Sequence, residues 1–169
     1  MFNLRFSSET NNPALLVAST EYQSIWKKDG KKIKEVMEKI SGLSFPKKEV
    51  SVIIFEGMSA SGSGDSPMKL RGSYSLQVKK GTLIHELGHR LIEQLKTRPA
   101  DLDEHDILFL ILYDIWTDIY GQEFADEMVR VEKDRKGHYD YGSAWNRALT
   151  LSKQERRDKF GLVKKLNGF

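Results

Sequence analysis

Apolar residues recur along this chain with the two spacings that distinguish strands from helices. Alternation with polar residues predicts strands over residues 2–6 and 74–78, and the continuous apolar run at residues 50–55 predicts a buried strand. Spacings of three and four predict helices over residues 20–41, 81–96, 106–120, 123–133, 143–151 and from 152 onward. These elements predict one α+β domain covering residues 1–169.

Local signals refine the limits of the first long helix. Residues 20–23 have the pattern of a capping box, which predicts the start of the helix, and Gly42 is expected just past its end. Gly30 lies inside this helix, where it is a candidate break.

Residues 57–72 are rich in glycine and serine, so they predict a loop that holds no packed element. They lack the Gly-Lys-Ser/Thr ending of a phosphate-binding loop. Such a loop is either a plain connection or a mobile lid beside an active site. The strand predicted at 74–78 is either simply exposed or, as a sheet edge, able to bind an extended peptide as an added strand.

Composition excludes several kinds of protein and site. The chain has no cysteine, so a disulfide framework and a thiolate metal site are both excluded. Its first ten residues lack the apolar core of a secretory signal, and the longest apolar run, residues 107–113, is too short to span a bilayer. We therefore expect a cytoplasmic protein that makes no membrane contact. The net charge of +3 is mild, and the basic residues near both ends are interleaved with acidic ones, so nucleic acid is not an expected partner.

The most informative stretch is His85-Glu86-Leu87-Gly88-His89, inside the helix predicted at 81–96. Residues four apart share one helix face, with about 5–6 Å between their Cβ atoms, so one metal ion can bind both imidazoles. Glu86 points to the side of the pair, where a carboxylate can act as general base on a water molecule. Gly88 weakens the helix by roughly 1 kcal/mol relative to alanine, so its missing side chain indicates a close neighbour.

The helix predicted at 106–120 is apolar on nearly all sides and carries Asp114 and Asp118, again four apart. An unpaired buried carboxylate is costly, so each aspartate needs a partner. A metal ion and a metal-bound histidine are natural partners for this pair.

These two helices resemble the zincin metallopeptidases, and within them the thermolysin-like gluzincins, over roughly residues 74–120. The resemblance implies a mixed sheet with an edge strand before the HExxH helix, and Zn²⁺ held by His85, His89 and Asp114. Asp118 would then orient a histidine from behind. An aspartate in place of the usual glutamate ligand is similar to the aspzincins. The metzincin pattern is absent, because Ile92 and Leu95 occupy its glycine and histidine positions.

Other residues are alternatives for the remaining roles. His105 faces away from Asp114 on the same helix, Glu104 and Asp106 lie at its solvated start, and His138 is far along the chain. Members of this class stabilise the oxyanion with a tyrosine or histidine, for which His138 and Tyr141 are candidates. Packing of a surface loop on the body explains these aromatic residues equally well.

The sequence thus predicts a zinc-dependent peptidase that acts on a peptide or protein, with Glu86 as general base. The alternative is a zincin-like binding or regulatory module in which the metal is structural or absent. The intact Glu86 favours the enzyme, because a structural site needs no base.

Overall fold

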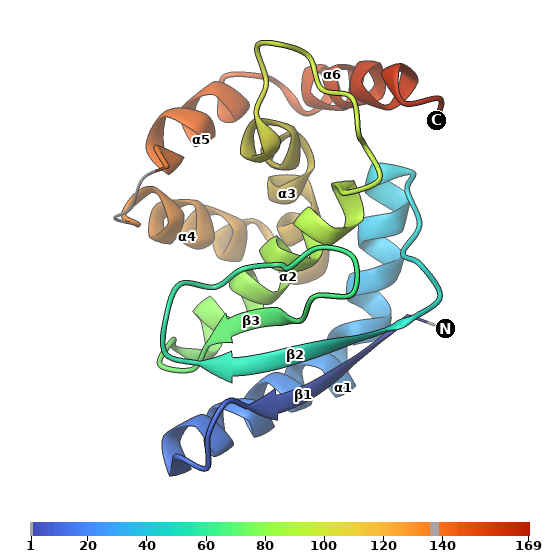
Figure 1. The fold of residues 1–169 in the computed structure, drawn as a ribbon. Coiled ribbons are helices and arrows are strands. Elements are labelled where there is room, and N and C mark those ends of the chain that lie inside the picture. Colours follow the sequence, from blue (N-terminus) through green and yellow to red (C-terminus); the bar gives the residue numbers. More distant parts are fainter. Residues whose placement is uncertain (1, 136–138) are drawn as a thin grey trace.

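The computed structural model describes residues 2–135 and 139–169. Within them the chain forms three strands and six helices (Figure 1): β1 (Asn3–Ser8), α1 (Pro13–Ser41), β2 (Glu49–Phe55), β3 (Met68–Arg71), α2 (Leu76–Ile92), α3 (Glu104–Tyr120), α4 (Gln122–Lys133), α5 (Tyr141–Leu149) and α6 (Lys153–Leu166). The predicted α+β class is confirmed.

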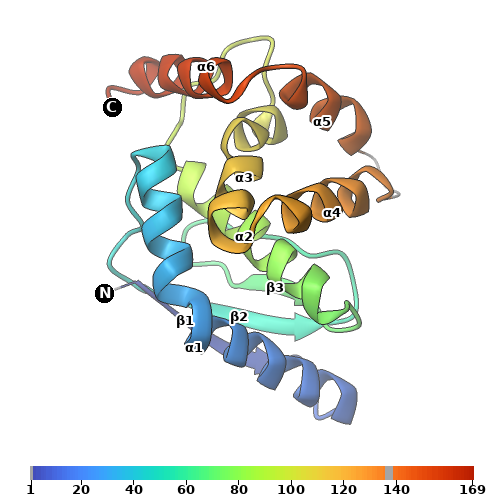
Figure 2. The ribbon, with the colours of Figure 1, turned by 180° about the vertical axis from the view of Figure 1, so that it is seen from behind.

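The sheet has the strand order β1-β2-β3, and both strand pairs are parallel. Val50, Val52 and Ile54 are buried while the residues between them are partly exposed, so one face of the sheet packs on helices. Figures 1 and 2 show the helices on that side. The predicted mixed sheet is therefore wrong for the three strands, and antiparallel pairing is confined to the bridge between Ala60 and Lys69 within the described residues.

Helix α1 connects β1 to β2 and covers the sheet. It begins at Pro13 with Asn12 as N-cap, so the start predicted at residue 20 is wrong. Its end is as predicted, because Gly42 adopts the left-handed conformation with φ 68°. Gly30 does not interrupt the helix, although Figures 1 and 2 show α1 changing direction along its length.

The region before the histidine helix differs most from prediction. Met68–Arg71 forms β3 inside the stretch that was predicted to be all loop. The predicted strand at 74–78 does not form, because the Ser75 side chain caps α2 by accepting a hydrogen bond from the backbone N–H of Val78. The edge strand that precedes the histidine helix is thus β3, and α2 starts at Leu76 rather than residue 81.

Helix α3 lies at the centre of the molecule and packs against all the other helices among the described residues. This position explains why its sequence is apolar on nearly every side. The predicted helices that became α3, α4, α5 and α6 are confirmed with small shifts at their ends. Among the described residues, no helix combines the length and the apolar character that are needed to cross a bilayer.

Gly88 lets α2 approach α3 closely. A Cβ atom at this position would lie 2.5 Å from Cδ1 of Leu108. Leu108 lies about one turn after His105 on α3, and Gly88 lies about one turn after His85 on α2. Each contact residue therefore shares a helix face with a histidine. The contact therefore brings the face of α3 that carries His105 against the face of α2 that carries the motif.

We expect Gly88→Ala to lower the free energy of unfolding by about 1–3 kcal/mol, because the added methyl group overfills this contact. The matched control is Gly161→Ala on α6, where an added Cβ meets nothing within 4 Å. That change should raise stability by about 0.4–1 kcal/mol. Denaturant unfolding of both variants checks the prediction, and equal stability of the two would contradict it.

Candidate metal centre

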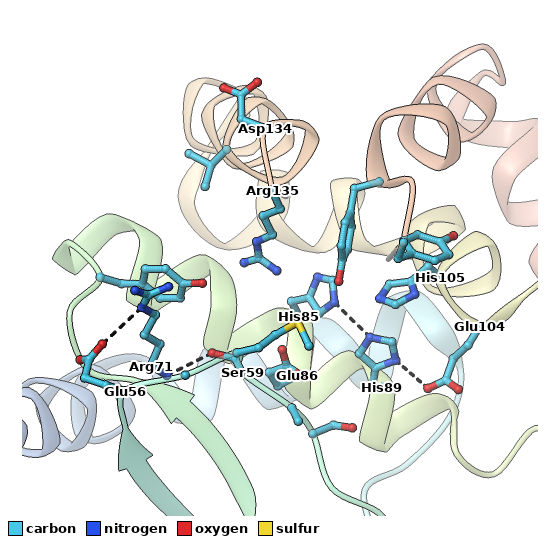
Figure 3. A pocket seen from close by; sticks show the side chains of 18 residues that line it. Glu56, Ser59, Arg71, His85, Glu86, His89, Glu104, His105, Asp134 and Arg135 are labelled. Atoms are coloured by element: carbon cyan, nitrogen blue, oxygen red, sulfur yellow. Dashed lines mark hydrogen bonds and ion pairs between the residues drawn. The ribbon is translucent and has the colours of Figure 1, made fainter. Parts of the chain in front are cut away.

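Three histidines converge where α2 meets α3 (Figure 3). His85 and His89 lie one turn apart on α2, with their Nε2 atoms 3.0 Å from each other. The ring centroid of His105, near the start of α3, is 5.5 Å from that of His85 and 4.7 Å from that of His89. One ring nitrogen from each histidine lies within 4.8 Å of the others, so a single metal ion can reach all three.

A carboxylate from a different helix contacts the outer nitrogen of each motif histidine. His85 Nδ1 lies 2.6 Å from Oε1 of Glu132 on α4, and His89 Nδ1 lies 2.7 Å from Oε1 of Glu104 on α3. The hydrogen bond with His89 lowers the pKa of Glu104 to about 2. Burial raises the pKa of Glu132, but the charge and hydrogen bond of His85 bring it below its usual value. Both carboxylates are therefore ionised acceptors, and each Nδ1–H donates.

With both Nδ1 atoms directed at carboxylates, the two Nε2 atoms face each other. In the neutral imidazoles that bind a metal ion, these Nε2 atoms carry the lone pairs. Two lone pairs at 3.0 Å repel unless a proton or a metal ion lies between them. Nitrogens bound to one tetrahedral zinc ion at about 2.0–2.1 Å would be roughly 3.3–3.4 Å apart, which is close to this separation. Burial is the largest cause that lowers the pKa of His105, to about 3, so this imidazole is neutral and offers a ring nitrogen to a metal ion. The three nitrogens fit zinc or a similar divalent ion.

Glu86 lines the same cavity as the histidines. Its side chain is buried, and this burial raises its pKa even though His85 and His89 oppose the shift. The largest causes of this shift are burial and the charges around the carboxylate. Glu86 thus differs from Glu104 and Glu132, whose carboxylates are occupied by histidines, and remains available to a ligand in the cavity.

The cavity has a volume of about 990 Å³. Its described lining comes from residues 56–61, Arg71, Tyr74, α2, the start of α3 and, after these, Val131, Asp134, Arg135, Tyr139 and Tyr141. Tyr141, predicted as an oxyanion stabiliser, lies in this lining with its ring centroid 5.0 Å from that of His105. Tyr139 also packs on His105, at 4.2 Å between centroids, and its ring lies 4.9 Å from that of Tyr141. His138, the other predicted candidate, lies outside the described residues.

Asp114 and Asp118 are not at this centre, so their predicted roles as metal ligand and histidine partner are wrong. Asp114 is buried and accepts a hydrogen bond from Nη2 of Arg156 at 2.9 Å. Asp118 is exposed, and its Oδ1 lies 3.8 Å from Nζ of Lys153, which is also 3.9 Å from Oδ1 of Asp114. The two aspartates do share a helix face, as their spacing predicted, but that face meets the basic helix α6.

The sequence does carry signals for Glu132 and His105, which were not among the predicted site residues. Glu132 follows Phe124 and Met128 at successive steps of four, which puts an acid on the apolar stripe of α4. His105 was correctly placed on the opposite face from Asp114, but that face is the one that meets α2. The sequence pattern could not show which face meets which helix.

Arg90 anchors the loop between β2 and β3 to α2. It donates hydrogen bonds to the backbone carbonyls of Ser61 at 2.7 Å, Gly64 at 3.2 Å and Ser66. The bridge from Ala60 to β3 holds the preceding part of the loop. Because residues 57–61 line the cavity, Arg90 fixes one wall of the site, and the segment predicted as loop or lid is tied down in this structure.

Comparison of the chain with family models, curated proteins and solved structures found no match. The zincin resemblance therefore depends on residues 85–89 and on the groups that the fold places around them.

We expect Arg90→Met to release the loop between β2 and β3, because three backbone carbonyls of this loop lose their shared donor. Subtilisin under limiting conditions should then cut within residues 57–67 at least about tenfold faster than in the unchanged protein, since proteolysis follows local opening. The control is the exposed Arg157→Met on α6. Mass spectrometry identifies the cut, and resistance equal to the control would show that Arg90 does not hold the loop.

Proposed function

We propose that this protein is a zinc-dependent metallopeptidase whose site is of the zincin kind. The observation that carries the proposal is the pair of Nε2 atoms of His85 and His89 facing each other at 3.0 Å, with the Glu86 carboxylate buried beside them. A metal site that serves only the fold has no need of such a carboxylate. Glu86 therefore favours the enzyme over a binding or regulatory module.

His85, His89 and His105 would hold the metal, and Glu132 and Glu104 would orient the first two. This set replaces the predicted ligand Asp114. Three protein ligands leave a further position for a water molecule or substrate, as catalytic zinc sites require. Zinc, when bound, supplies a Lewis acid that polarises a carbonyl group and lowers the pKa of water to about 7.

Glu86 performs the proton transfers of peptide hydrolysis in this proposal. Its carboxylate accepts a proton from the attacking water molecule as the oxygen adds to the scissile carbonyl carbon. It then gives that proton to the leaving nitrogen as the C–N bond breaks. The raised pKa of Glu86 suits both steps, because a carboxyl group must hold the proton between them.

Tyr141 would donate a hydrogen bond to the oxygen of the tetrahedral intermediate. Burial raises the pKa of its hydroxyl group, which keeps the donor protonated at neutral pH. Its ring lies against His105 and, with centroids 6.3 Å apart, near His85. Donors placed in this way typically contribute about 10²- to 10³-fold to turnover.

Glu86→Gln should retain the fold and bound zinc while peptide hydrolysis falls by about 10²- to 10⁴-fold, because the variant has no base of similar reach. Zinc content, thermal unfolding and hydrolysis of a casein-derived peptide mixture are measured on the same preparation. The unchanged protein stripped by a chelator and reloaded with zinc serves as control. Turnover that survives in zinc-loaded Glu86→Gln would remove Glu86 from the mechanism.

Loss of a residue that only orients a metal ligand, such as Glu132, typically weakens zinc binding roughly 10- to 100-fold. His105→Ala should weaken zinc binding by more than this, because it removes a ligand. Asp114→Asn is the contrasting variant. It should lose about 3–5 kcal/mol of stability, because Arg156 remains buried without its ion pair, yet bind zinc normally while folded. Competition with a chromophoric chelator gives both affinities at a temperature where each variant is folded. Weakened zinc binding in folded Asp114→Asn, with normal binding in His105→Ala, would restore Asp114 as the ligand.

A further inference from the structure

Arg135 places a positive charge in the cavity beside the histidines. It follows the C-cap of α4, and only 20% of its side chain is exposed. Figure 3 shows its guanidinium group pointing into the cavity, between Arg71 on one side and His85 on the other. A desolvated guanidinium group needs hydrogen-bond acceptors, since it carries five N–H donors and stays charged.

Partners within the described residues use little of this capacity. Nη2 donates to Oγ1 of Thr82 at 3.2 Å, and Nη1 lies 3.6 Å from Oε1 of Glu132, which is beyond a hydrogen bond. The two oxygens of Glu132 already contact His85 and Trp145. Arg135 therefore shares an ion pair with Glu132 and contacts Tyr141, but no hydrogen bond joins it to a carboxylate among the described residues.

The other arginine in the cavity lining is in a different state. Nε of Arg71 donates to Glu56 at 3.3 Å and to Ser73 at 3.0 Å. Its charge is thus offset within the protein. Of the two, Arg135 is the one with donors left for a ligand.

The position of Arg135 relative to His85 indicates which part of a ligand it meets. Oε1 of Glu132 contacts both Arg135 and Nδ1 of His85, so Arg135 lies on the Nδ1 side of this imidazole. The facing Nε2 atoms lie on the opposite side of the ring. Arg135 is therefore displaced from the reacting carbonyl and meets a neighbouring group of the substrate.

We propose that Arg135 binds a carboxylate group of the substrate and so selects peptides that carry one beside the scissile bond. A guanidinium group matches a carboxylate with two parallel hydrogen bonds, which is the strongest pairing open to it. The carboxylate comes from an acidic side chain or from the C-terminus of the peptide. Tyr74 and Tyr141 also line this part of the cavity and limit access of water to the ion pair. The inference rests on the proposed peptidase function for cleavage, but the binding step can be tested separately.

The experiment uses alanine-based peptides in which one residue, Glu or Gln, is moved along the chain. Each peptide is made with a free or an amidated C-terminus. Zinc-loaded protein should prefer the acidic member of one matched pair by at least about 30-fold in kcat/KM, the loss expected when a buried charge pair loses one partner. The position of the preferred acid, or the need for a free terminus, identifies the source of the carboxylate.

Arg135→Gln should reduce cleavage of the acidic peptide to the level of its amide match and leave the amide peptide and the zinc affinity unchanged. Arg135→Lys should give an intermediate preference, because it keeps the charge but loses the two-point geometry. Arg71→Gln is the matched control in the same cavity and should keep the preference. An equal fall in kcat for both members of the pair would assign Arg135 to the reacting oxygen or to the fold, and would overturn selection of a carboxylate.

Binding is measured with zinc-loaded Glu86→Gln and fluorescently labelled copies of the same peptides. Anisotropy should show the same preference for the acidic member, and Glu86→Gln combined with Arg135→Gln should lose it. Preferential binding without cleavage by the unchanged protein would overturn the peptidase and keep the role of Arg135. Equal binding of every matched pair would overturn the role of Arg135, whether or not the protein cleaves peptides.

Discussion

The close contact between α2 and α3 is the constraint on which the rest of the site depends. Gly88 has no side chain, and Leu108 fills the space that one would need. Without this approach His105 could not lie within reach of the motif histidines, and Glu104 could not meet His89. Gly88 lowers the stability of α2 as an isolated helix, but it allows the close packing that brings the three imidazoles together. Helix α3 can hold this position because every other described helix packs on it.

The buried carboxylates among the described residues have partners, with Glu86 as the exception. Asp114 has Arg156, Asp106 has Arg147, and Glu132 has His85 and Trp145. Each pair offsets the cost of removing a carboxylate from water. Glu86 has no comparable partner, and burial raises its pKa. An acid that the fold isolates rather than pairs is typical of a group that exchanges protons.

Sequence patterns predicted the helices well because their apolar spacing is set by burial, and α3 was recognised even as a wholly buried helix. They failed at residues 74–78, where the cap formed by Ser75 prevails over a short alternation. They also missed Met68–Arg71, a strand too short to show a period. In the site, the spacing of His85 and His89 was enough to predict that their imidazoles lie together, because both residues are on one helix. Asp114 was misassigned because the cost of burial proves that a partner exists without identifying it, and a salt bridge from α6 meets the same need as a metal.

Arg90 connects two parts of the site that are distant in sequence. It is the residue after His89, and its guanidinium group holds three carbonyls of the loop that forms one cavity wall. Rotation of α2 that displaced the His89 imidazole would also strain those hydrogen bonds, so the position of the wall is coupled to that of the imidazole. A cavity built in this way has its shape before a ligand arrives. Selection among ligands then depends on fit to a preformed surface, and little binding free energy is spent on ordering the chain.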